Sequence, residues 1–145
     1  MSLIVYLIAK NKDICIEEYE KELPIHFNEA FGFENCRKSL WGLGIVKELE
    51  CKMIYSLREQ DIYAFDEQIE ELEKELNMIL VNKDKISDTY DAEFIEERVN
   101  NALQIIAVAK KHKHILGVTI GWYGLKFWDN SIDDEVWSNT DEIVL

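Results

Sequence analysis

The chain has 145 residues, the size of one domain, and its sixteen lysine and arginine residues oppose twenty-nine aspartate and glutamate residues, for a formal net charge of -13. Apolar residues make up 48% of the chain, which is enough for a core and argues against disorder. A surface this acidic repels phosphate backbones, so we expect no nucleic-acid partner. It favours a basic protein as partner, although solubility alone also explains an acidic balance.

The first segment, residues 2–9, is apolar almost throughout, which is typical of a strand covered on both faces. It lacks the basic stretch and the small-residue cleavage site that frame the apolar part of a signal peptide. No apolar stretch in the chain approaches the roughly 20 residues of a membrane-spanning helix. We therefore expect a cytoplasmic protein with no membrane partner.

The next fifty residues are harder to interpret. Helical spacing of apolar side chains predicts a short helix over residues 13–23, and Pro24, the only proline, discourages its continuation. Residues 25–50 carry three glycines without a clear period, and the sequence assigns no element to them. Residues 51–57 are apolar enough to favour a strand.

The clearest element is an amphipathic helix that begins near Asp66, whose side chain we expect to cap it. Its polar side presents Glu67, Glu70 and Glu71. Its apolar stripe consists of Phe65, Ile69, Leu72, Leu76, Ile79 and Leu80.

A polar connector over residues 82–91 leads to a second amphipathic helix, which begins after Asp91. Carboxylates in its opening turns and lysines near its end complement the helix dipole, which explains the basic cluster without a ligand. We expect its stripe to be buried along Ile95, Val99, Ala102, Ile106 and Ala109.

Residues 114–122 then favour a strand, in which Gly117 and Gly121 indicate a bulge or close packing, and we expect Ile120 to be buried. Together these elements predict a single domain over residues 1–145 of the α/β or α+β class, with two principal helices on a small mixed sheet. The sequence leaves the oligomeric state open.

Two groups of residues contain the side chains that bind metals, and neither has the required pattern. Three cysteines lie far apart in the sequence and are expected to be buried thiols, and His112 and His114 would converge on one ion only in an extended chain. His26 is isolated in the sequence. We expect no metal ion.

A partial calcium-loop pattern occurs in the last segment. Asp129, Ser131 and Asp133 match its first three ligand positions. Asp134 then replaces the glycine that the turn needs, and Thr140 replaces the bidentate glutamate. The pattern therefore does not predict a calcium site.

Sequence motifs for catalysis are equally sparse. The glycines form neither a dinucleotide-binding fingerprint nor a phosphate loop, and no nucleophile elbow occurs. We therefore assign no catalytic residue and no cofactor, and expect a protein that is not an enzyme. The alternative is a small enzyme or metabolite-binding protein whose site assembles from distant residues.

The end of the chain combines acidic and aromatic residues, as do many protein interfaces, in which aromatic anchors are surrounded by charges that steer the partner. The alternative is that the tryptophans cover the sheet and bind no partner. The residues predicted to bind a partner are Glu67, Glu70, Glu71, Trp128, Asp133, Asp134, Glu135 and Trp137.

In size, acidity, lack of catalytic motifs and its acidic, aromatic end, the chain resembles the small immunity proteins that bacteria pair with toxins, many of them basic nucleases. The resemblance implies a non-catalytic protein that neutralises a basic toxin domain by occluding its active face. It rests on no signature motif, so no residue of that family is carried over to this sequence.

Overall fold

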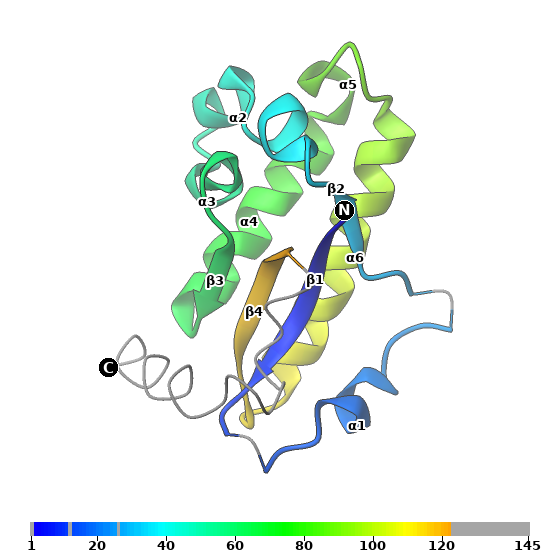
Figure 1. Cartoon of the computed structure of the whole chain (residues 1–145), viewed down its shortest axis with the longest axis vertical. Coiled ribbons are helices and arrows are strands. Elements are labelled where there is room, and N and C mark those ends of the chain that lie inside the picture. The colour runs from blue at the N-terminus through cyan, green and yellow to red at the C-terminus, as the bar shows by residue number, and fades with distance from the viewer. Residues whose placement is uncertain (1, 12, 26, 123–145) are drawn as a thin grey trace.

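The computed structural model describes residues 2–11, 13–25 and 27–122 (Figure 1). Their centre is a four-stranded sheet in the order β2-β1-β4-β3, and every pairing in it is antiparallel. The helices pack against this sheet, which confirms the predicted class of helices on a small sheet. The strands are β1 (Ser2–Ala9), β2 (Ala30–Phe33), β3 (Ile62–Phe65) and β4 (Ile115–Trp122).

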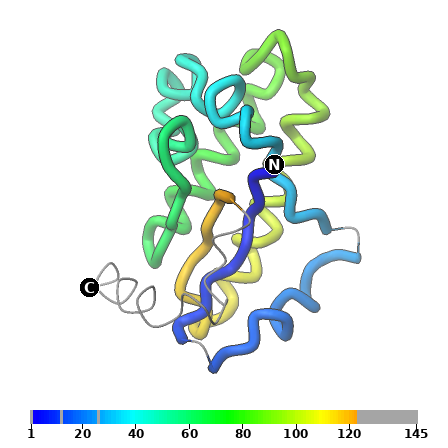
Figure 2. The backbone as a smooth tube through the Cα atoms, in the orientation of Figure 1, coloured from blue at the N-terminus to red at the C-terminus, as the bar shows by residue number. Residues whose placement is uncertain are grey.

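The expectation of a mixed sheet is wrong for the described strands, and the connections show why. After β3 the chain runs along one long helix, turns, and returns along a second one before it enters β4 (Figure 2). A pair of antiparallel helices brings the chain back to the end of the sheet that it left. Strand β4 therefore runs antiparallel to β3.

Strand β1 is apolar on both faces, as predicted, because it lies between two other strands and is buried along almost its whole length. Its residues alternate between two clusters. The helix-covered face takes Leu3, Val5 and Leu7, and the opposite face has a smaller cluster of Ile4, Tyr6, Ile8, Phe65 and Leu116.

The two long helices, α4 (Glu67–Val81) and α6 (Ala92–Lys111), pack on each other and on the sheet. No helix in the described ranges is long and apolar enough to cross a membrane. The residues expected in the core are buried, which confirms both helix faces and the last strand: Ile69, Leu72, Leu76, Val99, Ile106 and Ile120.

The starts of the two helices differ from each other. Helix α6 begins after Asp91 as predicted, and Asp91 caps it, because its Oδ1 atom accepts a 2.8 Å hydrogen bond from the Phe94 backbone N–H. Asp66 does not cap α4 through its side chain, and its backbone has a φ of 50°. Phe65, predicted in the helix stripe, is instead the last residue of β3 and lies on the opposite face of the sheet. Its N–H donates to the Gln68 side chain at 3.2 Å.

Short helices fill the connections. The predicted first helix exists but covers only α1 (Ile16–Glu20). The unassigned region contains β2, the π-helix η1 (Arg37–Trp41) and α2 (Gly44–Glu48). Later come α3 (Lys52–Tyr55), the 3-10 helix η2 (Ser56–Arg58) and, inside the predicted polar connector, α5 (Lys83–Ile86).

The predicted strand over residues 51–57 is wrong, and a contact from α4 explains the difference. The Glu75 carboxylate accepts hydrogen bonds from the backbone N–H groups of Met53 at 3.2 Å and Ile54 at 3.0 Å. These groups belong to the first turn of α3, where N–H groups lack partners within the helix. Glu75 supplies those partners from 21 residues away, so the local sequence could not reveal the helix.

Strand β3 is held at the edge of the sheet by Arg37 of η1. The guanidinium donates to Glu34 Oε1 at 2.5 Å, to the Leu57 carbonyl at 3.1 Å and to the Asp61 carboxylate. Burial tends to lower the pKa of Arg37, but the hydrogen bonds to Asp61 and Glu34 outweigh it and raise the pKa. Arg37 therefore stays charged and ties the residue before β3 to η1.

A β-bulge interrupts the pairing of β1 with β4. Ile8 pairs with Gly117 but Ala9 pairs with Ile115, so Leu116 is the extra residue. Gly117 also packs closely on β3, since a Cβ atom there would lie 2.3 Å from the Ala64 carbonyl oxygen. The expected close packing at Gly117 is confirmed, and the bulge lies at the neighbouring Leu116.

Removing core volume tests the assignment of the helix faces. Leu72→Ala or Ile106→Ala should each lower the free energy of unfolding by about 2 to 5 kcal/mol, because each leaves a cavity at a fully buried site. Urea denaturation followed by circular dichroism measures this. Val81→Ala, at a side chain that is 81% exposed, is the control and should change stability by less than about 0.5 kcal/mol. Equal losses at all three positions would contradict the assignment.

The glycine in the bulge gives a second test. Gly117→Ala should destabilise the fold by about 1 to 3 kcal/mol, because the added methyl group meets the Ala64 carbonyl of β3 and the buried Phe65 ring. Gly44→Ala is the matched control, since a Cβ atom there has no neighbour within 4 Å. It should be neutral or stabilise α2 by up to about 1 kcal/mol. Thermal unfolding of both variants distinguishes the steric cost of the added methyl group from its effect on backbone entropy.

Candidate functional site

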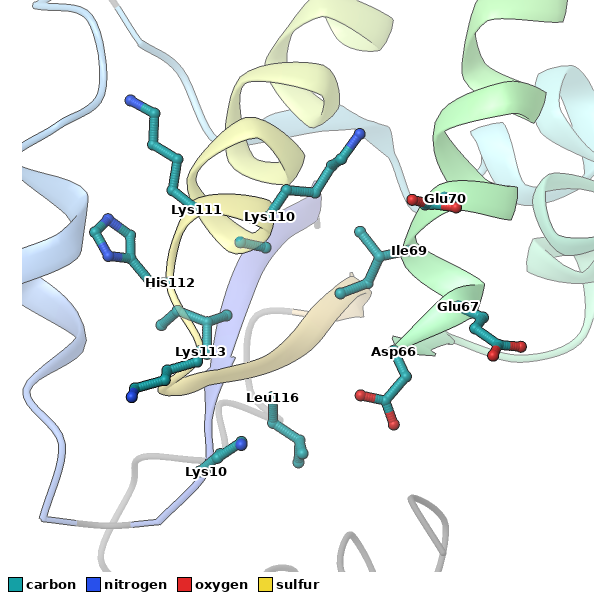
Figure 3. A pocket seen from close by; sticks show the side chains of 12 residues that line it. Lys10, Asp66, Glu67, Ile69, Glu70, Lys110, Lys111, His112, Lys113 and Leu116 are labelled. Carbon is teal, nitrogen blue, oxygen red and sulfur yellow. The ribbon is translucent and has the colours of Figure 1, made fainter.

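A groove of about 610 Å³ opens at the end of the sheet where β1 ends and β4 begins (Figure 3). It lies between the last turn of α6 and the first turn of α4. Its floor is apolar and includes Ile69, Ala109 and the two bulge residues Ile115 and Leu116. All four side chains are buried. The groove therefore combines an apolar floor with the charged walls described next.

The wall at the end of α6 is basic, and salt bridges hold part of it in place. Lys110 Nζ lies 3.0 Å from Glu73 Oε1 of α4, and this hydrogen bond raises the pKa of Lys110. His112 Nε2 lies 2.6 Å from Glu22 Oε2. Lys10 and Lys113 complete the wall, and within the described residues neither forms an ion pair.

The opposite wall, at the start of α4, is acidic. It consists of Asp66, Glu67 and Glu70, all exposed. None of the three carboxylates forms a hydrogen bond or an ion pair with another described residue. Lys110 is linked to α4 by its salt bridge with Glu73 and also interacts electrostatically with Glu70, whereas Lys10 and Lys113 form no ion pair with the acidic wall.

The structure separates the sequence-predicted partner-binding residues into two groups. Glu67 and Glu70 lie on the acidic wall, whereas Glu71 is exposed on α4 outside the groove. All three carboxylates are directed away from the core, as expected. The other five predicted residues lie outside the described residues: Trp128, Asp133, Asp134, Glu135 and Trp137.

The candidate metal ligands that lie in the described part of the chain do not come together. His112 lies against Glu22 and beside the Tyr19 ring, with 4.7 Å between ring centroids. In the ranges 2–11, 13–25 and 27–122 there is no group of three His, Cys, Asp or Glu side chains that could hold a metal ion. His26 and the partial calcium loop from Asp129 lie outside the described residues.

A row of hydroxyl groups crosses the smaller apolar cluster on the other face of the sheet. Thr119 of β4 is in register with Tyr6 of β1 and with Tyr63 of β3. Burial raises the pKa of both tyrosines. The two phenols therefore stay protonated at neutral pH and can donate hydrogen bonds, but they do not serve as a general base.

The basic wall was missed by sequence analysis. The lysines at the end of α6 were explained by the helix dipole, and Lys110 and Lys111 do lie in its last turn. Lys113 lies beyond the helix and Lys10 beyond β1, and the Lys10 N–H donates a 3.0 Å hydrogen bond to the His114 carbonyl. This contact brings together residues more than a hundred positions apart. In the sequence, the cluster of Lys110, Lys111 and Lys113 was the one sign of this wall.

The three cysteines are free, but the expectation that all are buried is wrong for Cys15. Cys15 is exposed beside α1, and its thiol donates to Glu17 at 3.3 Å. Cys36 and Cys51 are buried. Burial raises the pKa of Cys51 to about 11, with a smaller contribution from the negative charge of Glu75.

These environments predict the reactivity of the thiols. In the native protein at neutral pH a thiol reagent should modify Cys15 rapidly and leave Cys36 and Cys51 unmodified, because both are buried and Cys51 stays protonated well above neutral pH. All three should react in denaturant. Cys15→Ser should remove the fast reaction, and a remaining fast thiol in that variant would contradict the described burial.

The comparisons with known proteins provide no relative from which a role could be transferred. No family model, no curated protein and no solved structure matches this chain. The chemistry of the groove and of the outer side of α4 is therefore the basis for a functional assignment.

Proposed function

We propose that the chain is a non-catalytic binding module that neutralises a basic partner protein, in the manner of an immunity protein that occludes the active face of a toxin in the cytoplasm. The observation that carries the proposal is the outer side of α4. Glu67, Glu70 and Glu71 are exposed there, and none forms a salt bridge with a described residue, although Glu70 interacts electrostatically with Lys110. Carboxylates that the fold does not use are available to a cationic surface.

The fold holds these carboxylates on a rigid support. The opposite side of α4 is anchored in the core through Ile69, Leu72 and Leu76. Two further carboxylates of the same helix serve the fold itself, since Glu73 binds Lys110 and Glu75 binds the start of α3. Binding therefore requires little reordering of the backbone, which limits the entropic cost of association.

Electrostatics define what such a surface contributes. A net charge of -13 attracts a basic protein over long distances and raises the association rate, whereas the affinity depends on a few well-packed contacts. Charge pairs at an exposed surface each contribute little. We therefore attribute to the α4 carboxylates a role in steering and register.

A second candidate function has its own support. The groove, with its apolar floor and charged walls, has the volume of a small-ligand site, which favours a metabolite-binding protein or small enzyme assembled from distant residues. Tyr6 and Tyr63 do not favour general-base catalysis, because burial raises the pKa of both phenols and keeps them protonated.

The product of the gene adjacent to this one is the probe for the first proposal. Expressed alone it should arrest growth of the host, and co-expression of this chain should restore growth. In a purified pair, reversing Glu67, Glu70 and Glu71 to lysine should slow association by about tenfold or more, and added salt should slow the wild type similarly. Stopped-flow fluorescence measures the association rate.

A charge-matched control separates steering from total charge. Asp84, Asp88 and Glu93 are also exposed carboxylates, but they lie near the far end of α4, on α5, the following connector and the start of α6. Reversing these three should slow association much less. If the gene product is harmless, or growth is not restored, the immunity function is wrong. If growth is restored but the association rate does not respond to salt or to either set of charge reversals, α4 is not part of the interface.

A further inference from the structure

Most of the charged side chains on the walls of the groove form no ion pair in the described structure, although Glu70 interacts electrostatically with Lys110. Lys10 and Lys113 on one side and Asp66, Glu67 and Glu70 on the other have no ion pair with any described residue, including each other. Figure 3 shows the two sets on opposite sides of Ile69 and Leu116. Opposite charges held apart across an apolar floor are complementary to a molecule that carries both charges at its two ends.

We propose that this groove binds a short peptide with free ends. Its terminal carboxylate would lie against Lys10 and Lys113, its terminal ammonium against the α4 carboxylates, and its apolar side chains on the floor. Charge-assisted hydrogen bonds at both ends then add to apolar contact in the middle. This inference does not depend on the proposed partner protein, although Glu67 and Glu70 contribute to both surfaces.

The size of the groove favours a peptide over a single amino acid. Its volume of about 610 Å³ falls within the range of about 300 to 1,000 Å³ typical of drug-sized ligands. Lys10 and Lys113 form no ion pair with Asp66, Glu67 or Glu70, so a ligand that contacts both sets must extend across the floor. In a free amino acid one carbon atom separates the two charged groups, whereas a short peptide separates them by several residues and can place its side chains on the apolar floor.

The groove is also well supported, which is what a binding site of fixed shape requires. The Lys110–Glu73 salt bridge joins the ends of the two walls. The hydrogen bond from Lys10 to His114 fixes the end of β1 beside the start of β4, and a 3.1 Å hydrogen bond from the Ile115 N–H to the His112 carbonyl closes the turn after α6. Each wall is therefore positioned by contacts that do not involve the unpaired charges.

The test uses trileucine with free ends, its N-acetyl form and its C-terminal amide. Titration followed by amide chemical shifts should show saturable changes at Ile69, Ala109 and Leu116 with the free peptide. Either cap should weaken binding by about tenfold, because it removes one charged contact. Absence of saturable shifts at these amides, or equal affinity of free and capped peptides, would overturn the proposal.

Variants of each wall assign the two ends of the ligand. With Lys10→Gln and Lys113→Gln, free trileucine should bind about tenfold more weakly, and amidation should have no further effect. With Glu67→Gln and Glu70→Gln, free trileucine should again bind about tenfold more weakly, and N-acetylation should have no further effect. The control pair, Lys85→Gln and Asp88→Asn, is exposed and lies outside the groove, so it should leave all three affinities unchanged. Cap effects that persist in both wall variants would contradict the assigned orientation.

The outcomes of this test and of the growth test are distinguishable. A protein that binds trileucine in the groove but does not restore growth is a small-ligand binder, and the partner proposal alone is then wrong. A protein that restores growth but shows no groove shifts with trileucine refutes the peptide site alone.

Discussion

The structure depends on the burial of both faces of the central strand pair. Strands β1 and β4 are each eight residues long, pair along almost their whole length and expose only the residue at one end. Because alternate side chains point to opposite faces, such a pair needs apolar neighbours on both sides. The long helices α4 and α6 cover one face, and β3 contributes Phe65 to the cluster on the other. Misplacement of either strand would expose both clusters at once.

The groove is a consequence of where this pair ends. Ala9 and Ile115 are its last partners, so the residues just outside, Lys10 and Lys113, project at the end of the sheet. The bulge at Leu116 places two consecutive apolar residues under them, one belonging to each hydrophobic cluster. Ile115 and Leu116 therefore both line the groove at the end of the sheet, although their side chains belong to opposite faces.

Helix α4 shows how one element serves both stability and binding. Its apolar stripe is buried in the core, and Glu73 and Glu75 make contacts that hold α6 and α3 in place. Burial raises the pKa of Glu75, because it disfavours the charged carboxylate. The hydrogen bonds that this carboxylate accepts from two backbone N–H groups offset part of that cost. The remaining carboxylates, among them Glu67 and Glu71, make no such contact within the described residues and are available to a partner.

The sequence by itself determined the elements whose signal is local. Residues 2–9 and 114–122 are apolar runs with β-branched residues, and the stripes of α4 and α6 have a period close to that of a helix, so burial of positions such as Leu72 and Ile106 followed directly. The tertiary structure decided the rest, because the responsible contacts join distant residues. Glu75 makes residues 52–55 helical, Arg37 fixes β3, and the pairing of β1 with β4 brings Lys10 to Lys113. A one-dimensional pattern carries no information about which distant carboxylate or backbone group will satisfy a short segment.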